Sequence, residues 1–154
     1  MKYLLATLPA LLVIGAFLAF AHWVPQVGWK PEVAAGLSPE MTPPQLAQVG
    51  ERLFKGRGCT VCHVVDPAQG WKAPPRAPNL WGIGARSDVA YIVESLYSPQ
   101  AKVVEGYAPI MPAATNPPAN LNYEEVVAVV NYLLSLGGRP SVRIGDIPRP
   151  PGGQ

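Results

Sequence analysis

The chain has two cysteines, and both lie in one short motif that ends in a histidine, Cys59-Thr60-Val61-Cys62-His63. Two thiols three positions apart, with an imidazole directly after them, are what covalent attachment of a c-type haem requires. The thiols would form thioether links to the vinyl groups, and the histidine would reach the iron from one face. We therefore predict one covalent haem c, bound by Cys59, Cys62 and His63, with His63 as an iron ligand.

Three other chemistries use similar residues. A thioredoxin-type redox pair requires a βαβ context, and no such pattern surrounds the motif. A structural zinc site needs about four ligands, whereas outside the motif the chain has no cysteine and one histidine, His22. A disulfide between the two cysteines is possible in an oxidising compartment, but it would leave His63 without a role.

Three segments have the apolar periodicity and end signals of helices, and they must position the motif. The first begins after the N-cap Thr42 and runs to Gly56, directly before the motif. The second covers residues 89–97, and the third begins after Asn122 and closes at Gly137. Long proline-rich loops join them, and loops of that length are uncommon unless functional. Because no β alternation competes, we predict an all-α domain with three main helices.

An apolar run at the N-terminus predicts a membrane helix. Residues 3–24 contain no ionisable side chain except His22, and about 22 helical residues extend about 33 Å, enough for a bilayer core of about 30 Å. With Lys2 on its first side, the positive-inside rule places the remaining chain outside the cytoplasm. A cleaved signal peptide is the alternative, because Ala19-Phe20-Ala21 fits a cleavage pattern that would remove residues 1–21.

The chain therefore divides into an anchor at residues 1–24, a linker at 25–41, a helical domain at 42–138 and a tail at 139–154. The linker is rich in proline and lacks periodicity, which suits a semi-extended tether. The tail is rich in proline and glycine, and we expect either a mobile end or a strap on a partner.

The composition excludes several classes of protein. Hydrophobic residues make up 49% of the chain and the net charge is only +2, the reverse of what keeps a chain disordered. A nucleic-acid partner is not expected, because it would require a basic face with several phosphate contacts.

Over about residues 42–138 the chain resembles the class I cytochrome c family. The resemblance rests on an ordered set of motifs, of which the CTVCH motif is the centre. The others are Gly50 and Phe54 before it, Ala77-Pro78-Asn79-Leu80, Gly84-Ala85-Arg86, Leu96-Tyr97-Ser98-Pro99, Ile110-Met111-Pro112 and Asn131-Tyr132-Leu133. It implies three main helices wrapped around the haem, with the first and third helices crossing at Gly50 and with Phe54 and Tyr132 near the crossing.

The resemblance also implies roles for four residues after the motif. The carbonyl of Pro78, which has no competing N–H, would accept a hydrogen bond from the iron-binding histidine and orient its ring. Leu80 belongs to the segment that packs against the proximal side of the haem. Trp81 is a candidate contact with the haem or its propionates, or a packing residue. Arg86 matches the family's propionate-facing arginine, although an alanine interrupts the Gly-Arg pair in this chain.

Met111 is the candidate sixth ligand of the iron. The chain has three methionines, Met1, Met41 and Met111, and Met111 alone lies downstream in a proline-stiffened loop able to reach back over the haem. A core methionine that fills a packing gap is the alternative. Thioether ligation raises the potential and closes the site, as an electron carrier requires.

We accordingly expect an electron carrier and not an enzyme, with single electrons moving in a respiratory or photosynthetic chain. The alternative is a haem-based sensor or enzyme with an open sixth position. Similar anchored domains serve terminal oxidases, nitric oxide reductases and quinol-oxidising complexes, so we expect a redox partner of that kind. The predicted location is the extracytoplasmic face of a cell membrane, with a single membrane pass.

Overall fold

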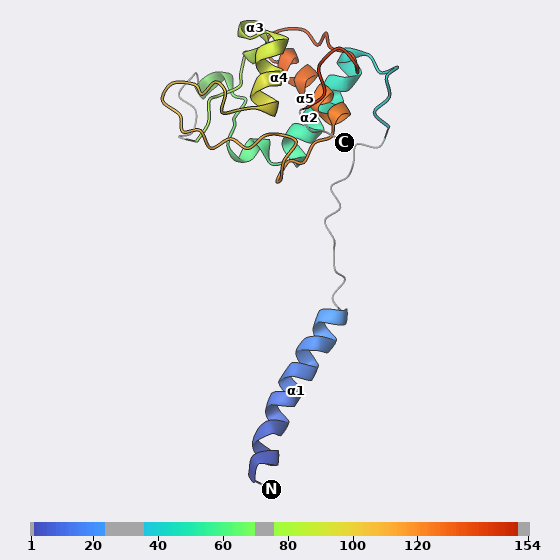
Figure 1. Ribbon diagram of the computed structural model, residues 1–154, viewed down its shortest axis with the longest axis vertical. Coiled ribbons are helices and arrows are strands. Elements are labelled where there is room, and N and C mark those ends of the chain that lie inside the picture. Colours follow the sequence, from blue (N-terminus) through green and yellow to red (C-terminus); the bar gives the residue numbers. More distant parts are fainter. Residues whose placement is uncertain (1, 24–35, 70–75, 151–154) are drawn as a thin grey trace. The chain divides into compact units, whose positions relative to one another are not determined.

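The computed structural model describes residues 2–23, 36–69 and 76–150, with the side chains of the first range described from Pro9 onward (Figure 1). The chain divides into two compact units, Met1–Pro31 and Glu32–Gln154. The described residues form helices, turns and loops without a strand, which confirms the all-α class. Residues 24–35, which include most of the predicted linker at 25–41, lie outside the described residues, as does the end of the tail after residue 150.

The first unit contains one helix, α1 (Lys2–Trp23), which includes Pro9. Its described large apolar side chains are all exposed: Leu11, Leu12, Val13, Ile14, Phe17, Leu18, Phe20 and Trp23. Among the residues that the structure describes, no helix combines the length and the apolar character needed to cross a membrane. The membrane anchor at residues 1–24 therefore stays a prediction.

The second unit contains the three predicted helices, α2 (Pro43–Gly56), α4 (Val89–Tyr97) and α5 (Tyr123–Ser135). A short helix, α3 (Ile83–Arg86), and two 3-10 turns, η1 (Cys59–Val61) and η2 (Pro67–Gln69), were not predicted. Sequence periodicity does not detect elements of three or four residues, because they complete at most one turn.

Local capping explains why the predicted starts are correct. At α2, the backbone N–H and the hydroxyl of Thr42 both donate to Oε1 of Gln45, each at 2.9 Å. At α5, Oδ1 of Asn122 accepts from the N–H of Glu125 at 2.9 Å, and Oε2 of Glu125 accepts from the N–H of Asn122 at 3.0 Å. This reciprocal capping box satisfies two N–H groups that a helix start leaves without partners.

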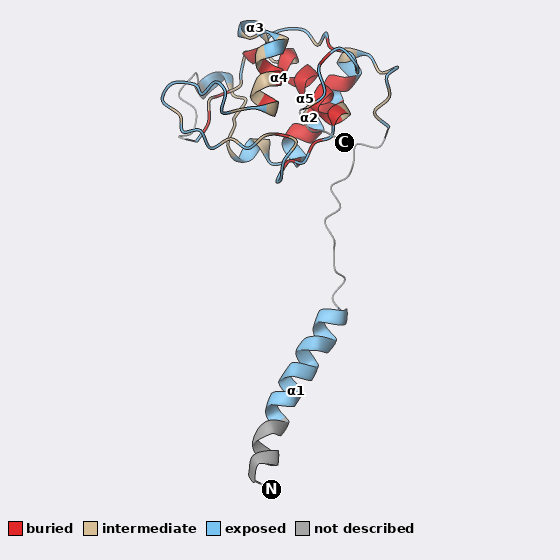
Figure 2. Cartoon of the chain, viewed as in Figure 1, coloured by how far each residue is buried: buried red, intermediate tan, exposed pale blue. Residues whose placement is uncertain are grey.

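Helices α2 and α5 cross at close range, as predicted (Figure 1). A Cβ atom built on Gly50 would lie 2.0 Å from the carbonyl oxygen of Ala128, so only glycine permits this approach. Beside the crossing, the rings of Phe54 and Tyr132 lie 5.3 Å apart between centroids. Figure 2 shows that the buried residues gather on these two helices, and α5 carries the centre of the core.

The segment after α5 packs on its own domain, and this differs from the expected mobile end or partner strap. Val142 and Ile147 are 4% and 6% exposed. Asn131 of α5 donates to the carbonyl of Val142 at 2.8 Å and accepts from its N–H at 3.1 Å. The hydroxyl of Tyr123 donates to the carbonyl of Ile147 at 2.9 Å. Hydrogen bonds from buried α5 side chains thus order an irregular segment whose sequence has no helical or strand pattern.

Candidate functional site

The CTVCH motif lies directly after α2, at a sharp turn of the chain. Gly58 has a φ of +84°, a left-handed conformation that glycine adopts without strain. Cys59 begins the 3-10 turn η1, and the N–H of His63 donates to the carbonyl of Cys59 at 2.9 Å. Cys59 and Cys62 are both partly buried free thiols, so the structure contains no disulfide between them. Burial raises the pKa of the Cys59 thiol, which favours its neutral form.

The imidazole of His63 is held from one side. Its Nδ1 lies 2.9 Å from the carbonyl oxygen of Pro78, which is the contact that the family resemblance implies. A carbonyl accepts hydrogen bonds and does not donate them, so the proton must lie on Nδ1 and the Nε2 lone pair stays available. Burial lowers the pKa of His63 below its ordinary value, although the bond to Pro78 acts in the opposite direction. A neutral imidazole with a free Nε2 is the form that binds a metal.

The turn that carries Pro78 also contains Leu80 and Trp81. Leu80 is half-buried and packs against the hydrophobic core, and its N–H donates to the carbonyl of Val64 at 2.9 Å. The Trp81 side chain is 49% exposed, while the backbone N–H and carbonyl of this residue bond to Asn79 and Arg86. Contact of either side chain with a haem stays a prediction.

The guanidinium of Arg86, at the end of α3, donates to two backbone carbonyls of the same turn. Nη2 donates to the carbonyl of Asn79 at 3.0 Å, and Nη1 donates to the carbonyl of Trp81. Burial lowers the pKa of Arg86 from its ordinary value. The structure therefore shows a structural role for Arg86, and the propionate contact implied by the resemblance stays a prediction.

Met111 lies in the loop between α4 and α5, where it is partly buried against the hydrophobic core. Backbone hydrogen bonds tie the loop directly after it to α4, because the N–H of Ala114 donates to the carbonyl of Leu96 at 2.7 Å. The N–H of Leu121 closes the same loop by donating to the carbonyl of Ala114 at 2.9 Å. The loop that carries the thioether is thus anchored to the core on its C-terminal side.

Two residues near the motif were missed by the sequence reasoning. Arg57 lies two positions before Cys59, and its Nη2 is 2.7 Å from Oε1 of Glu125 in a buried ion pair. Asn79 is 2% exposed and bonds to both the turn and the segment after the motif. Asn79 belongs to the Ala77-Pro78-Asn79-Leu80 motif of the family resemblance, so its importance could have been predicted. Nothing in the local sequence distinguishes Arg57 from a solvated surface arginine.

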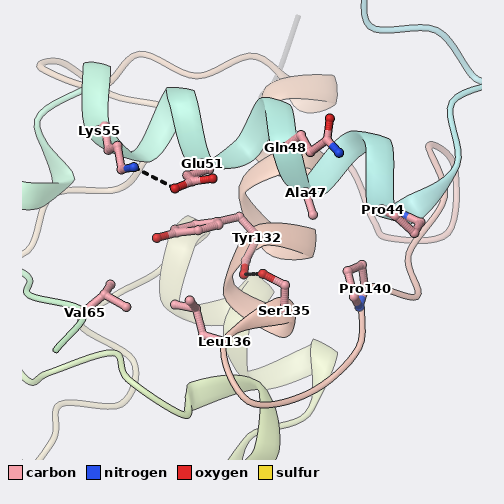
Figure 3. A pocket seen from close by; sticks show the side chains of 10 residues that line it. All are labelled: Pro44, Ala47, Gln48, Glu51, Lys55, Val65, Tyr132, Ser135, Leu136 and Pro140. Atoms are coloured by element: carbon pink, nitrogen blue, oxygen red, sulfur yellow. Dashed lines mark hydrogen bonds and ion pairs between the residues drawn. The ribbon is translucent and has the colours of Figure 1, made fainter. Parts of the chain in front are cut away.

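A shallow groove on the surface between α2 and α5 is a separate feature. Its wall includes Tyr132, Leu136 and the ion pair between Lys55 and Glu51, whose Nζ and Oε1 atoms are 2.6 Å apart (Figure 3). None of the predicted haem-binding residues lines it. The groove therefore does not belong to the site around His63.

The donor set fits a c-type haem. Cys59 and Cys62 are unpaired thiols, His63 has a free Nε2, and Met111 supplies a thioether from a different segment. These are the groups that would form two thioether links and supply a nitrogen and a sulfur ligand to the iron of a haem c. In the part of the chain that the structure describes, no three or more His, Cys, Asp or Glu residues group as a metal site, so the zinc alternative gains no support.

Comparison with known protein families agrees with this geometry. The sequence pattern of the family described as Cytochrome c matches residues 47–137, which is more than half of the chain. No curated protein matches the chain.

Proposed function

The chain belongs to the cytochrome c family, and we propose that it passes single electrons between redox partners through one haem c bound by Cys59, Cys62 and His63. Membership of the family implies a covalently bound haem and an electron carrier. One observation carries the proposal. Within a CXXCH motif with two free thiols, Pro78 holds the imidazole of His63 in the tautomer that leaves Nε2 for iron.

The residues have different proposed roles in binding the haem and in setting its reduction potential. Cys59 and Cys62 would fix the position of the cofactor through covalent bonds, and His63 would supply a nitrogen ligand to the iron. When bound, the haem supplies an iron centre that exchanges one electron. Met111 is proposed to supply a second protein ligand to the iron, a thioether, which would close the site to small ligands and raise the reduction potential. Leu80, Trp81 and Arg86 are proposed to line the haem side of the turn after Ala77.

Carbon monoxide separates the electron carrier from a haem sensor or enzyme with an open sixth position. The reduced wild-type protein should bind carbon monoxide poorly at neutral pH, because Met111 occupies the position where the gas would bind. Met111→Ala should bind it promptly and have a lower reduction potential. Prompt binding by the wild type, or a wild-type spectrum for Met111→Ala, would remove the assignment of Met111.

The location proposed for the domain is the extracytoplasmic face of a membrane, with α1 as a retained anchor. The support comes from the apolar sequence of residues 3–24 and from the exposed side chains of α1, such as Leu12, Val13 and Phe17, at 67%, 69% and 68%. So many exposed apolar side chains on one helix mark a surface that contacts a membrane or another protein. The mass of the mature chain decides between this anchor and a signal peptide cleaved after Ala21.

The partner proposed is a redox protein such as a terminal oxidase, a nitric oxide reductase or a quinol-oxidising complex. The support is apolar surface on two segments that carry candidate haem residues. Val61 and Ile110 are 71% and 61% exposed, and apolar side chains of this kind form the centre of protein interfaces. Substituting Ile110 with Glu should slow electron transfer to the true partner, and an unchanged rate would argue against this surface.

A further inference from the structure

The segment that begins with His63 lies against the turn that begins with Pro78, and hydrogen bonds join the two along their length. The imidazole bonds to the carbonyl of Pro78 at 2.9 Å. One step further, the N–H of Leu80 donates to the carbonyl of Val64 at 2.9 Å. The two segments are therefore positioned by one another, and any movement of the turn would move the Pro78 carbonyl away from Nδ1.

The side chain of Asn79 adds further hydrogen bonds between these segments. Its Nδ2 donates to the carbonyl of Asp66 at 2.7 Å, and its Oδ1 accepts from the N–H of Asp66 at 3.3 Å. The same Oδ1 accepts from the N–H of Trp81 at 3.0 Å. Because Asn79 is only 2% exposed, a side chain without these polar atoms would leave buried backbone groups unsatisfied.

Arg86 holds the same turn from its other end. Its guanidinium donates to the carbonyls of Asn79 and Trp81, while the side chain of Asn79 faces the backbone of Asp66. The turn is thus fixed by the side chain of Asn79, by the N–H of Trp81 and by the carbonyls of Asn79 and Trp81. Since Pro78 has no N–H and no polar side chain, its neighbours must set the direction of its carbonyl.

We propose that Asn79 is a positioning residue for the iron ligand, because it fixes the turn so that the Pro78 carbonyl accepts the Nδ1 proton of His63. This rests on the proposed function, since it concerns how His63 binds iron. A hydrogen bond from Nδ1 to a carbonyl fixes the ring and makes the imidazole a stronger donor to the metal. Asn79 therefore acts on the reduction potential through Pro78 and His63.

The test compares Asn79→Ala with Asn131→Ala in the full-length haem protein. Asn131 is a matched control, because it too is a buried amide with hydrogen bonds to backbone groups. Its side chain donates to two carbonyls and accepts from one N–H. The readouts are the exchange rate of the His63 Nδ1 proton, measured by NMR in the reduced state, and the reduction potential. Asn79→Ala should accelerate exchange about tenfold, as the loss of about 1.4 kcal/mol of protection implies, and shift the potential to more positive values. Asn131→Ala should change neither.

Each outcome is decisive. If Asn79→Ala matches Asn131→Ala in both exchange rate and potential, the inference is overturned and the proposed function is unaffected. If the wild-type chain carries no covalent haem, the proposed function fails before any variant is compared. If Asn79→Ala does not accumulate as folded protein, Asn79→Asp provides a second variant, because it keeps the acceptor Oδ1 but loses the Nδ2 donor to the carbonyl of Asp66. Asn79→Asp should also accelerate exchange, and a wild-type rate would overturn the inference.

Discussion

At the residue scale, the ion pair between Arg57 and Glu125 joins the attachment motif to the last helix. The two side chains are 7% and 2% exposed, and Nη2 lies 2.7 Å from Oε1. The second guanidinium nitrogen, Nη1, donates to the carbonyl of Ala119 at 3.4 Å. The other oxygen of Glu125 caps α5 at Asn122. One buried pair thus connects the residue before Gly58 with the loop before α5 and with the start of that helix.

Removing one member of this pair should be strongly destabilising. Arg57→Leu leaves the Glu125 carboxylate buried without its partner, which should cost about 3–5 kcal/mol in the free energy of unfolding. The double variant Arg57→Leu, Glu125→Leu should recover part of that loss, because no unpaired charge remains. Urea unfolding of the haem-bound protein measures both values.

The exposed pair formed by Lys55 and Glu51 serves as the control for that experiment. Lys55 is on the surface, where its bond to Glu51 raises its pKa, but solvent screens such pairs. Lys55→Ala should therefore have little effect on unfolding. If Lys55→Ala and Arg57→Leu lowered the free energy of unfolding equally, the burial of an ion pair would not determine how destabilising its removal is.

Which residues were predictable depends on how local their roles are. Cys59, Cys62 and His63 lie within five consecutive residues, so their spacing alone indicates the cofactor. The pairing of Arg57 with Glu125 spans 68 positions, and neither residue type indicates burial. The role of Arg86 on backbone carbonyls was also not predictable, because it depends on the conformation of a turn.

At the element scale, the crossing of α2 and α5 limits which residues fit at Gly50. Adding one methyl group there would bring a Cβ to 2.0 Å from the carbonyl oxygen of Ala128 and to 2.9 Å from Cβ of Tyr132. The first neighbour is backbone and cannot move aside without shifting a helix. The close approach therefore depends on this one position.

Gly50→Ala should separate the two helices and lower the free energy of unfolding by about 1–3 kcal/mol. Gly56→Ala, in the same helix, is the matched control, because a Cβ there meets nothing within 4 Å. That change should be neutral or stabilise the helix by up to about 1 kcal/mol. Thermal unfolding of the two variants decides the matter, and a Gly50→Ala protein as stable as Gly56→Ala would contradict the crossing.

The elements that were predicted share local signals, and those that were missed do not. The caps at Thr42, Asp88 and Asn122 lie within three residues of the groups they bind, so short sequence patterns predict the three main helices. The segment at residues 139–150 has no periodicity. Residues of α5 order this segment. The ring of Tyr123 lies 4.3 Å from the guanidinium carbon of Arg149, and Asn131 donates a hydrogen bond to the carbonyl of Val142.

At the scale of the whole molecule, the low charge and the high proline content have separate causes in the two units. Only 14% of the residues are charged, and the chain contains 19 prolines. The helix of the first unit accounts for part of the low charge, since Lys2 is its only Asp, Glu, Lys or Arg residue. In the second unit, long loops join few helices, and a covalent cofactor would give those loops a surface to pack on.

The central claim is that the chain carries one covalent haem on Cys59 and Cys62, and extraction after denaturation tests it most directly. The full-length protein is purified from a host that assembles c-type cytochromes, denatured, and washed with acidified organic solvent. We predict that one haem per chain remains attached, and that the variant with serine at both cysteines retains none. Release of the haem into the solvent, or a purified wild-type chain without haem, would contradict the account.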